Sequence, residues 1–301
     1  MINRTEQNKT ILSAITCRII GFVYDICLQS FPKTVRIETT NACNSQCTIC
    51  PHHKMIRPTK IMEESLFFNI IDECAENRCK EVHLHNFGEP FLDKRLERFV
   101  AYSKEKGIEK VKVFSNGSII TGDRARGILE AGLDEIKISF DGASKEEFEE
   151  IRRPLKFDEV VENIAGLVKL RNALGKKTKV HVACCSTLDK TRTMQMLESI
   201  VDGFSFGKVH NWGTEKYGTD KTSIRKPCSR VWQTFTVLAN GDVSLCCLDY
   251  DGQIILGRIG VSNNSIMSIW KNNDYRRIRS LHKCGKQNEI ELCSNCSKSF
   301  I

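Results

Sequence analysis

The chain has 301 residues, of which 41% are hydrophobic and 27% are charged, a balance typical of a globular protein with an ordinary core. Only 6 Pro and 19 Gly are present, which excludes a collagen-like chain and argues against a largely disordered one. The net charge is +8, from 45 Lys and Arg against 37 Asp and Glu. Since the basic residues form no run of five or more, we expect no nucleic-acid partner.

The N-terminal segment, residues 1–34, predicts one amphipathic helix. Its apolar side chains recur at spacings of three and four, at Leu12, Ile15, Ile19, Phe22 and Ile26. Arg18 and Asp25 interrupt this apolar run, so it predicts neither a transmembrane helix nor a signal peptide. We expect the apolar face to pack on the rest of the protein, and a membrane-surface anchor is the alternative.

Between residues 35 and 210, six strand-like runs alternate with helical patterns. The predicted strands are 35–39, 81–87, 110–115, 135–140, 178–186 and 204–210. The predicted helices are 64–76, 92–106, 123–131, 145–152, 157–174 and 193–203. This alternation predicts an α/β domain with a parallel sheet, either doubly wound or a partial barrel.

The loop after the first predicted strand carries three cysteines, Cys43, Cys47 and Cys50. The chain has 15 cysteines, an odd number, and several lie two or three residues apart, which favours metal ligation in a reduced, cytoplasmic compartment over a disulfide framework. Three thiolates can hold an iron–sulfur cube and leave one iron open to another ligand. A zinc loop completed by His52 or His53 is the alternative.

The next three predicted strands end in short polar motifs. The second strand ends in NFGEP (residues 86–90), the third in SNG (115–117) and the fourth in SFDG (139–142). Each motif alone is an ordinary turn, but α/β folds place their chemistry at the carboxyl ends of strands. In this order, and together with the CNSQCTIC loop (43–50), the motifs resemble the radical S-adenosylmethionine (SAM) superfamily.

The resemblance implies a partial (β/α)6 TIM-like barrel and an enzyme with a [4Fe-4S] cluster on Cys43, Cys47 and Cys50. In that family the open iron binds the amino and carboxylate groups of SAM. One electron then cleaves SAM, and the resulting 5′-deoxyadenosyl radical takes hydrogen from a substrate. An external electron donor such as flavodoxin or ferredoxin is therefore implied.

The family motifs also imply which residues contact SAM. The residues carried over are Gly88, Glu89 and Pro90 for the methionine amino group, and Asn116 and Ser139 for the ribose and carboxylate. Arg152 or Arg153 could neutralise the carboxylate. Two positions depart from the family pattern: Ile49 stands where relatives have an aromatic residue, and Phe87 where many have glycine.

Beyond residue 210 the sequence pattern changes. A polar stretch, 211–226, predicts a linker, and Asn240–Gly241 predicts the turn of a hairpin with strands 234–238 and 243–247. A short helix is predicted over 265–281. The result is a small cysteine-rich β-hairpin/helix extension over residues 227–301.

Six cysteines lie in this extension: Cys228, Cys246, Cys247, Cys284, Cys293 and Cys296. The hairpin could bring Cys228 near Cys246, and the final pair could complete four thiolates. This frame resembles the twitch, or shortened SPASM, extension of the superfamily. The resemblance implies a second, auxiliary [4Fe-4S] cluster on Cys228, Cys246, Cys293 and Cys296, and zinc on the same ligands is the alternative. We expect Cys247 to be a bystander and leave Cys284 open.

An auxiliary cluster without an open iron can accept the electron left after hydrogen abstraction. We therefore expect a small-molecule substrate, oxidised at an alcohol, with a peptide substrate or an epimerisation as alternatives. Only about 34 residues precede the first strand, too few for a peptide-binding domain. Candidate cavity residues are His83, His85, His210, Asn211 and Trp212. Cys184 or Cys185 could serve as the hydrogen donor of an epimerase, and Asp249, Tyr250 and Asp251 are candidate bases.

Overall fold

The computed structural model describes residues 4–186, 189–212, 224–261 and 264–299. The chain divides into two compact units. The core unit comprises Val35–Val209 and Val237–Gly241, and the extension unit comprises Met1–Thr34, His210–Thr236 and Asp242–Ile301. The N-terminal segment therefore belongs with the cysteine-rich extension. Most of the predicted linker, residues 213–223, lies outside the described residues.

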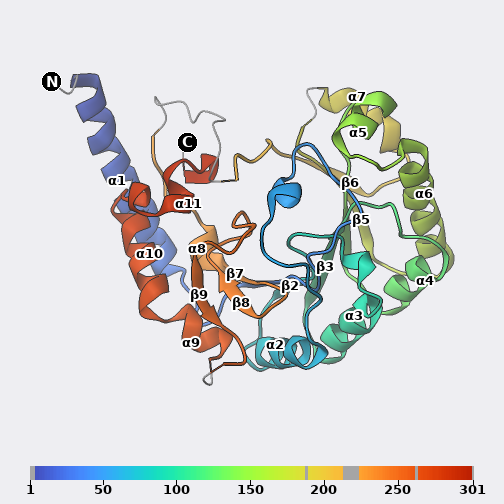
Figure 1. Ribbon diagram of the computed structural model, residues 1–301, viewed down its shortest axis with the longest axis horizontal. Helices are drawn as coiled ribbons and strands as arrows, with labels where there is room; N and C mark the ends of the chain where they lie inside the picture. Colours follow the sequence, from blue (N-terminus) through green and yellow to red (C-terminus); the bar gives the residue numbers. More distant parts are fainter. Residues whose placement is uncertain (1–3, 187–188, 213–223, 262–263, 300–301) are drawn as a thin grey trace. The chain divides into compact units, whose positions relative to one another are not determined.

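Six strands of the core unit lie side by side in the order β6-β5-β4-β3-β2-β1 (Figure 1). The strands are β1 (Thr34–Ile37), β2 (Glu81–His83), β3 (Lys110–Ser115), β4 (Glu135–Ser139), β5 (Lys179–Cys184) and β6 (Gly203–Phe206). Neighbouring strands from β2 to β6 are parallel. Several strands are shorter than predicted because the polar motifs that follow them turn away from the sheet, as at Gly88, which has φ of 91°.

Six helices connect these strands and lie along one side of the sheet in Figure 1. They are α2 (Glu64–Glu76), α3 (Leu96–Glu105), α4 (Gly122–Glu130), α5 (Lys145–Ile151), α6 (Phe157–Ala173) and α7 (Lys190–Leu197). Helix α3 begins later than predicted because Pro90–Leu92 forms a separate 3₁₀ turn. Helix α7 begins earlier because the Asp189 side chain accepts a hydrogen bond from the Arg192 amide.

The two faces of the sheet differ in composition. One face is apolar and fully buried, and consists of Val82, Val111, Val113, Ile136, Ile138, Val180 and Val182. The alternate side chains on the other face are mostly polar and half-buried. A doubly wound sheet buries apolar residues on both faces, whereas the inner face of a barrel need not, so the pattern favours the predicted partial barrel. The α/β class with a parallel sheet is confirmed.

The extension unit combines α1 (Arg4–Ile26) with short elements from the C-terminal region. These are α8 (Arg230–Gln233), β7 (Thr234–Val237), β8 (Asp242–Ser244), β9 (Ile255–Arg258), α9 (Ile266–Trp270), α10 (Asn273–Lys283) and α11 (Glu291–Ser294). The predicted hairpin is formed by β7 and β8, and β9 adds an unpredicted antiparallel strand beside β8. The single helix predicted over 265–281 is two helices, because the Asn272 side chain caps α10 by accepting the Tyr275 amide at 2.9 Å.

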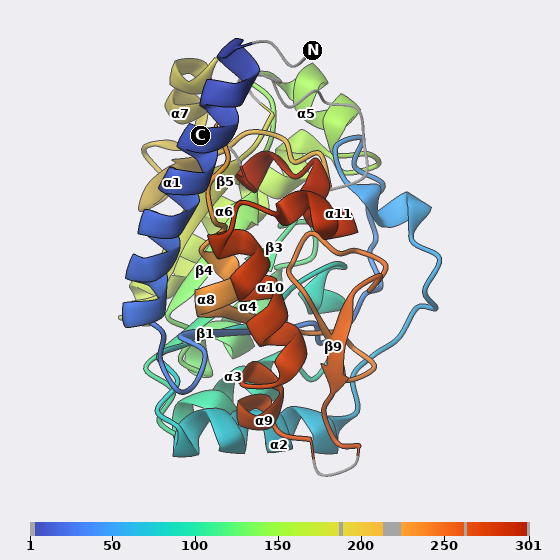
Figure 2. The same cartoon turned by 90° about the vertical axis from the view of Figure 1, so that its left-hand side faces the viewer.

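The packing of α1 differs from the prediction. Its apolar stripe is exposed rather than packed, with Ile15 50%, Ile19 62% and Phe22 63% accessible. Helix α1 instead places its small-residue side along α10, with Cys17 fully buried and Gly21 against Lys283 (Figure 2). The expectation was wrong because the side of α1 that meets α10 carries Gly21 rather than the apolar stripe, and the Lys283–Asp25 ion pair joins the two helices. None of the described helices is long and apolar enough to cross a membrane.

Candidate active site and auxiliary metal centre

The three cysteines of the first loop follow β1 and are tied together locally. The Ser45 hydroxyl lies 3.3 Å from the Cys43 Sγ and 3.4 Å from the Cys47 Sγ. The loop backbone is bound to the end of α5, where the Gln46 amide donates to the Arg153 carbonyl at 2.6 Å and the Thr48 amide to the Ile151 carbonyl at 2.8 Å. These contacts between protein atoms hold the loop in place without a metal.

Two thiols of this loop, those of Cys43 and Cys50, ionise poorly on their own. Burial raises the pKa of Cys43 and raises the pKa of Cys50 to about 12. A cation that binds here must therefore supply the charge that keeps the thiolates deprotonated, as an iron–sulfur cluster does. Among the described residues, no three His, Cys, Asp or Glu side chains are close enough together to hold a single metal ion. One nitrogen of His52 is already engaged, with Nε2 2.7 Å from the Asn41 carbonyl.

The NFGEP turn lies directly against the cysteine loop. The Glu89 amide donates to the Ala42 carbonyl at 2.7 Å. A Cβ atom at Gly88 would lie 2.6 Å from the Thr40 carbonyl oxygen, so only glycine allows this close approach. The motif backbone is thus held beside the thiols, where the SAM contacts of Gly88 and Pro90 are predicted.

The Glu89 carboxylate is fully buried and accepts three internal hydrogen bonds. Its donors are the Ser115 hydroxyl at 2.7 Å, the Asn116 amide at 2.6 Å and the Phe91 amide at 3.1 Å. Burial raises its pKa, and these donors act in the opposite direction. Glu89 therefore joins the ends of β2 and β3. The predicted SAM contact of its side chain stays a prediction.

The polar residues after β3 and β4 take different positions. The Asn116 side chain donates to the Asn44 side chain in the cysteine loop at 2.8 Å. Ser139 ends β4 on the half-buried polar face of the sheet. Asn116 thus connects the SNG motif to the loop that carries the thiols.

Arg152, rather than Arg153, lies at the cysteine loop. Its Nη1 is 3.9 Å from the Cys47 Sγ, and its Nε donates to the Asp141 Oδ2 at 2.8 Å. Burial alone would raise the pKa of Asp141, but the Arg152 charge and the Cys185 and Ser186 amides hold it below its usual value. Arg153 is exposed, and its carbonyl accepts the Gln46 amide.

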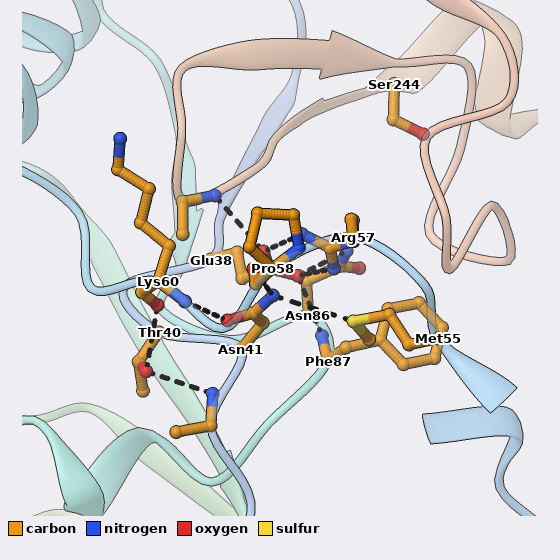
Figure 3. Close-up of polar contacts among 12 residues, drawn as sticks. Glu38, Thr40, Asn41, Met55, Arg57, Pro58, Lys60, Asn86, Phe87 and Ser244 are labelled. Carbon is orange, nitrogen blue, oxygen red and sulfur yellow. Dashed lines mark hydrogen bonds and ion pairs between the residues drawn. The ribbon is translucent and has the colours of Figure 1, made fainter. Parts of the chain in front are cut away.

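Sequence reasoning missed Glu38, which lies at the end of β1 and is fully buried (Figure 3). Arg57 binds it in a bidentate pair, with Nη1–Oε1 2.6 Å and Nη2–Oε2 2.7 Å. The Asn86 side chain donates to the same carboxylate at 3.2 Å, the Phe87 amide at 3.3 Å and the Ala239 amide at 3.1 Å. The available signal was a carboxylate directly after the first strand, two positions beyond Arg36.

Asn41 holds the chain that follows the third cysteine (Figure 3). Its Oδ1 accepts the Lys60 amide at 2.6 Å, and its Nδ2 donates to the Pro58 carbonyl at 3.0 Å and to the Met55 sulfur at 3.5 Å. With Glu38, it fastens the segment 55–60 to the end of β1. Both ends of the cysteine loop are therefore anchored at one point.

The other predicted site residues lie in different parts of the structure. His83 and His85 lie on the polar side of the core sheet, whereas Cys184 lies on the apolar side with Val180 and Val182. His210, Asn211 and Trp212 belong to the extension unit. There the Asn211 Oδ1 accepts the Ser297 amide at 3.3 Å, a structural contact.

Four extension cysteines line one pocket, and they are the predicted set Cys228, Cys246, Cys293 and Cys296. Leu245, Leu248 and Leu292 shield it, and Arg230 and His282 add polar atoms. Burial raises the pKa of Cys228 and Cys246, so these thiols also need a bound cation to ionise. This set of four thiols fits the ligands of an iron–sulfur cluster.

The remaining extension residues have other surroundings. Cys284 is exposed at the end of α10, away from the cavity lining. Asp249 is buried and accepts the Gln253 amide at 2.7 Å and the Ile254 amide at 3.0 Å, so its carboxylate shapes the loop after β8. This disfavours Asp249 as a base. Trp270 is buried against Tyr275, with ring centroids 4.9 Å apart, and so belongs to the core of the extension unit.

Comparison with known families identifies this arrangement. The Radical SAM superfamily model matches residues 37–205, more than half of the chain, so the chain belongs to the radical SAM superfamily. The model of SPASM, an iron-sulfur cluster-binding domain, matches residues 228–297. The predicted cofactors, SAM and a [4Fe-4S] cluster, are confirmed at the level of the family, and the SPASM match implies auxiliary iron–sulfur clusters. The chain is a radical SAM enzyme, a class that takes a substrate and a reductant.

Particular relatives extend over much of the chain. The S-adenosyl-L-methionine-dependent 2-deoxy-scyllo-inosamine dehydrogenase of Niallia circulans is 22% identical over 271 residues, which cover 89% of this chain and 93% of the relative. The GTP 3′,8-cyclase of Clostridium perfringens (strain SM101 / Type A) is 31% identical over 167 residues, 54% of this chain and 50% of the cyclase. These matches are consistent with a radical SAM oxidoreductase.

Two solved structures share the fold. BtrN in complex with AdoMet and 2-DOIA superposes with a TM-score of 0.62 at 19% identity, covering 88% of this chain and 92% of BtrN. Streptococcus suis SuiB bound to precursor peptide SuiA gives 0.68 at 14% identity, covering 87% of this chain and 70% of SuiB. At these identities the likeness concerns the fold alone.

Proposed function

We propose that this enzyme dehydrogenates an alcohol of a small polar molecule, using SAM at the first cysteine loop and an auxiliary [4Fe-4S] cluster in the extension. The observation that carries the proposal is the pocket lined by Cys228, Cys246, Cys293 and Cys296, with no fifth cysteine among the described residues that line it. The relative of similar length, named as a dehydrogenase, supports it. An external one-electron donor such as flavodoxin or ferredoxin is part of the proposal, and a cytoplasmic location stays a prediction.

The residues of the core unit would prepare the first half of the reaction. Cys43, Cys47 and Cys50 would hold a cluster that, once reduced, delivers the electron for SAM cleavage. The backbone of residues 88–90 would receive the methionine amino group, and Glu89 would keep that backbone in place. Arg152 lies beside Cys47 and would supply positive charge for the SAM carboxylate.

The second half of the reaction must remove one proton and one electron from the substrate radical. The alcohol carbon would lose a hydrogen atom, a base would take the hydroxyl proton, and a carbonyl would form once an auxiliary cluster supplied an acceptor for the remaining electron. Cys228, Cys246, Cys293 and Cys296 would be the ligands of that acceptor. Four protein ligands leave no iron open for SAM, so this centre is suited to electron transfer.

The proposal is tested by the mass of the product and by the fate of SAM. Reduced holoenzyme is incubated anaerobically with SAM and a panel of polyols, and the expected product is two mass units lighter than its substrate. The double variant C246S/C293S should still form 5′-deoxyadenosine but no oxidised product, whereas C43S should form neither. A product of unchanged mass would indicate epimerisation and contradict the proposal, and so would oxidation by C246S/C293S.

A further inference from the structure

The polar face of the core sheet is rich in positive charge. Its basic residues are Arg36, Lys110, Lys112, Lys137 and Lys179, and its acidic residues are Glu81 and Glu135. Five positive charges stand against two negative charges, a surplus of three. The surplus is a property of this face alone, since the apolar face carries no charge.

The two carboxylates lie at one end of the face and are shared among lysines. Lys110 Nζ is 3.0 Å from the Glu135 Oε2, and Lys112 Nζ is 3.3 Å from the Glu81 Oε2. Lys137 is farther from Glu135, at 3.6 Å, and its Nζ lies 5.6 Å from the centre of the Phe114 ring. Both carboxylates are therefore already paired with lysines of β3 and β4.

Arg36 on β1 has no such partner. Its Nε and Nη1 are buried, and within the described part of the chain they make no hydrogen bond. A guanidinium carries five N–H donors in a fixed fork, and burying it without an acceptor is costly. An anion with two oxygens in a plane satisfies this geometry directly.

Two histidines complete the surroundings of Arg36 without adding charge. Burial, followed by the Arg36 charge, lowers the pKa of both His83 and His85, so both rings are neutral at pH 7. Their Nδ1 atoms are also buried without a hydrogen-bond partner. The His85 ring lies 3.9 Å from the Phe114 ring, and Phe114 pairs in register with Lys137 on the neighbouring strand. Unpartnered polar atoms and surplus positive charge thus meet at one place.

We propose that the substrate of this enzyme carries an anionic group, a carboxylate or a phosphate, which Arg36 binds in bidentate fashion with help from Lys137 and His85. The inference rests on the proposed function, because it assigns the polar face to the substrate. Phe114 immediately precedes the SNG motif at the end of β3, and that motif contains the predicted SAM contact Asn116. The anion would therefore lie next to the predicted SAM site. A protonated amine, such as an inosamine carries, would meet repulsion here. This enzyme and its dehydrogenase relative are therefore expected to differ in substrate.

The test uses four matched six-carbon sugars as probes: glucose 6-phosphate, glucuronate, glucose and glucosamine. Binding to SAM-loaded holoenzyme is measured by isothermal titration calorimetry under anaerobic conditions. We expect at least one anionic sugar to bind about tenfold tighter than glucose, and glucosamine to bind weakest. Preference for glucose 6-phosphate over glucuronate assigns a phosphate, and the reverse assigns a carboxylate. Equal binding of all four, or no binding of any, overturns the inference.

Variants make the test specific to the guanidinium. R36Q should lose the preference for the anion, and R36K should keep part of it because the charge remains but the fork is lost. R126Q, which removes an exposed arginine on α4, is the matched control and should bind like the wild type. If R36Q fails to load clusters, the ranking of the four sugars on the wild type still decides. SAM cleavage without an anion preference overturns only this inference, whereas absence of cleavage in cluster-loaded wild type overturns the proposed function.

Discussion

Glu38 connects more of the site than any single cysteine does. It is fully buried, pairs with Arg57, and receives amide donors from the NFGEP turn and from Ala239. A buried carboxylate that satisfies five donors stabilises a defined geometry only as long as every partner stays in place. The cysteine loop and the turn that meets it are therefore positioned by a residue with no direct part in the chemistry.

We expect E38Q to destabilise the protein by about 3–5 kcal/mol, because the Arg57 guanidinium, only 13% exposed, would lose its charged partner. Unfolding of holoenzyme in urea checks this. The control is E130Q, which breaks an exposed pair with Arg126 and should change stability by less than about 0.5 kcal/mol. Equal destabilisation by the two variants would contradict the role given to Glu38.

Arg230 lies at the predicted auxiliary cluster, as Arg152 lies at the first cysteine loop. It lines the auxiliary cavity, and its pKa is raised first by Cys247 and also by Cys228 and Cys246. We expect R230Q to lower the midpoint potential of the auxiliary cluster by about 60 mV or more, which for one electron is a tenfold change, because the reduced centre loses a neighbouring positive charge.

A redox titration monitored by electron paramagnetic resonance measures this potential. R258Q removes an exposed arginine of the same unit that pairs with Asp242, and it should leave the potential unchanged. If both variants shift the potential alike, or if R230Q raises it, Arg230 does not act on the cluster as described.

At the scale of single residues, the sequence predicts the cysteine sites better than it predicts the ion pairs. The spacing of Cys43, Cys47 and Cys50 makes the first cysteine site recognisable in the sequence. The spacing of the four extension cysteines does the same for the second site. Arg57 lies 19 residues beyond Glu38, and only the path of the intervening loop brings the two together. The unpartnered state of Arg36 is likewise invisible without the sheet register, since sequence alone shows only an arginine in a strand.

Among the elements, the strands of the core were predictable in position and the ends of the strands were not. The alternating apolar residues of β3 to β5 set where each strand lies, while the motifs that follow decide where pairing stops. Helix α1 shows the opposite outcome: its presence was predicted and its packing face was wrong. Amphipathicity assigns an apolar face, but the contact with α10 depends on a small residue and an ion pair that periodicity does not reveal.

Substitutions on α1 test that packing. We expect G21V to destabilise the protein by about 1–3 kcal/mol, because a Cβ at position 21 would lie 2.4 Å from the Lys283 Cγ and 3.2 Å from its Cα. In contrast, I19S on the exposed stripe should cost less than about 0.5 kcal/mol, since Ile19 is 62% accessible. Thermal unfolding of the two variants distinguishes these outcomes. A larger loss for I19S would show that the stripe is the packed face.

The whole molecule combines a radical SAM core with a cysteine-rich extension to which the N-terminal helix belongs. This grouping was not evident from the sequence, where residues 1–34 precede the core directly. The family and its cofactors follow from motifs, whereas the substrate does not, because no motif encodes it. What the structure adds is a charge pattern on the polar face and a shielded four-cysteine cavity, and together they support oxidation of an anionic small molecule.

The most direct test of this account is the iron content of the triple variant C43A/C47A/C50A after anaerobic reconstitution. This variant removes the ligands of the SAM-binding cluster and leaves the extension cysteines intact. We predict about four irons per chain in the variant against about eight in the wild type, with a [4Fe-4S] signal that C246S/C293S abolishes when added. A triple variant that retains no iron would contradict the auxiliary cluster, and with it the proposed dehydrogenation.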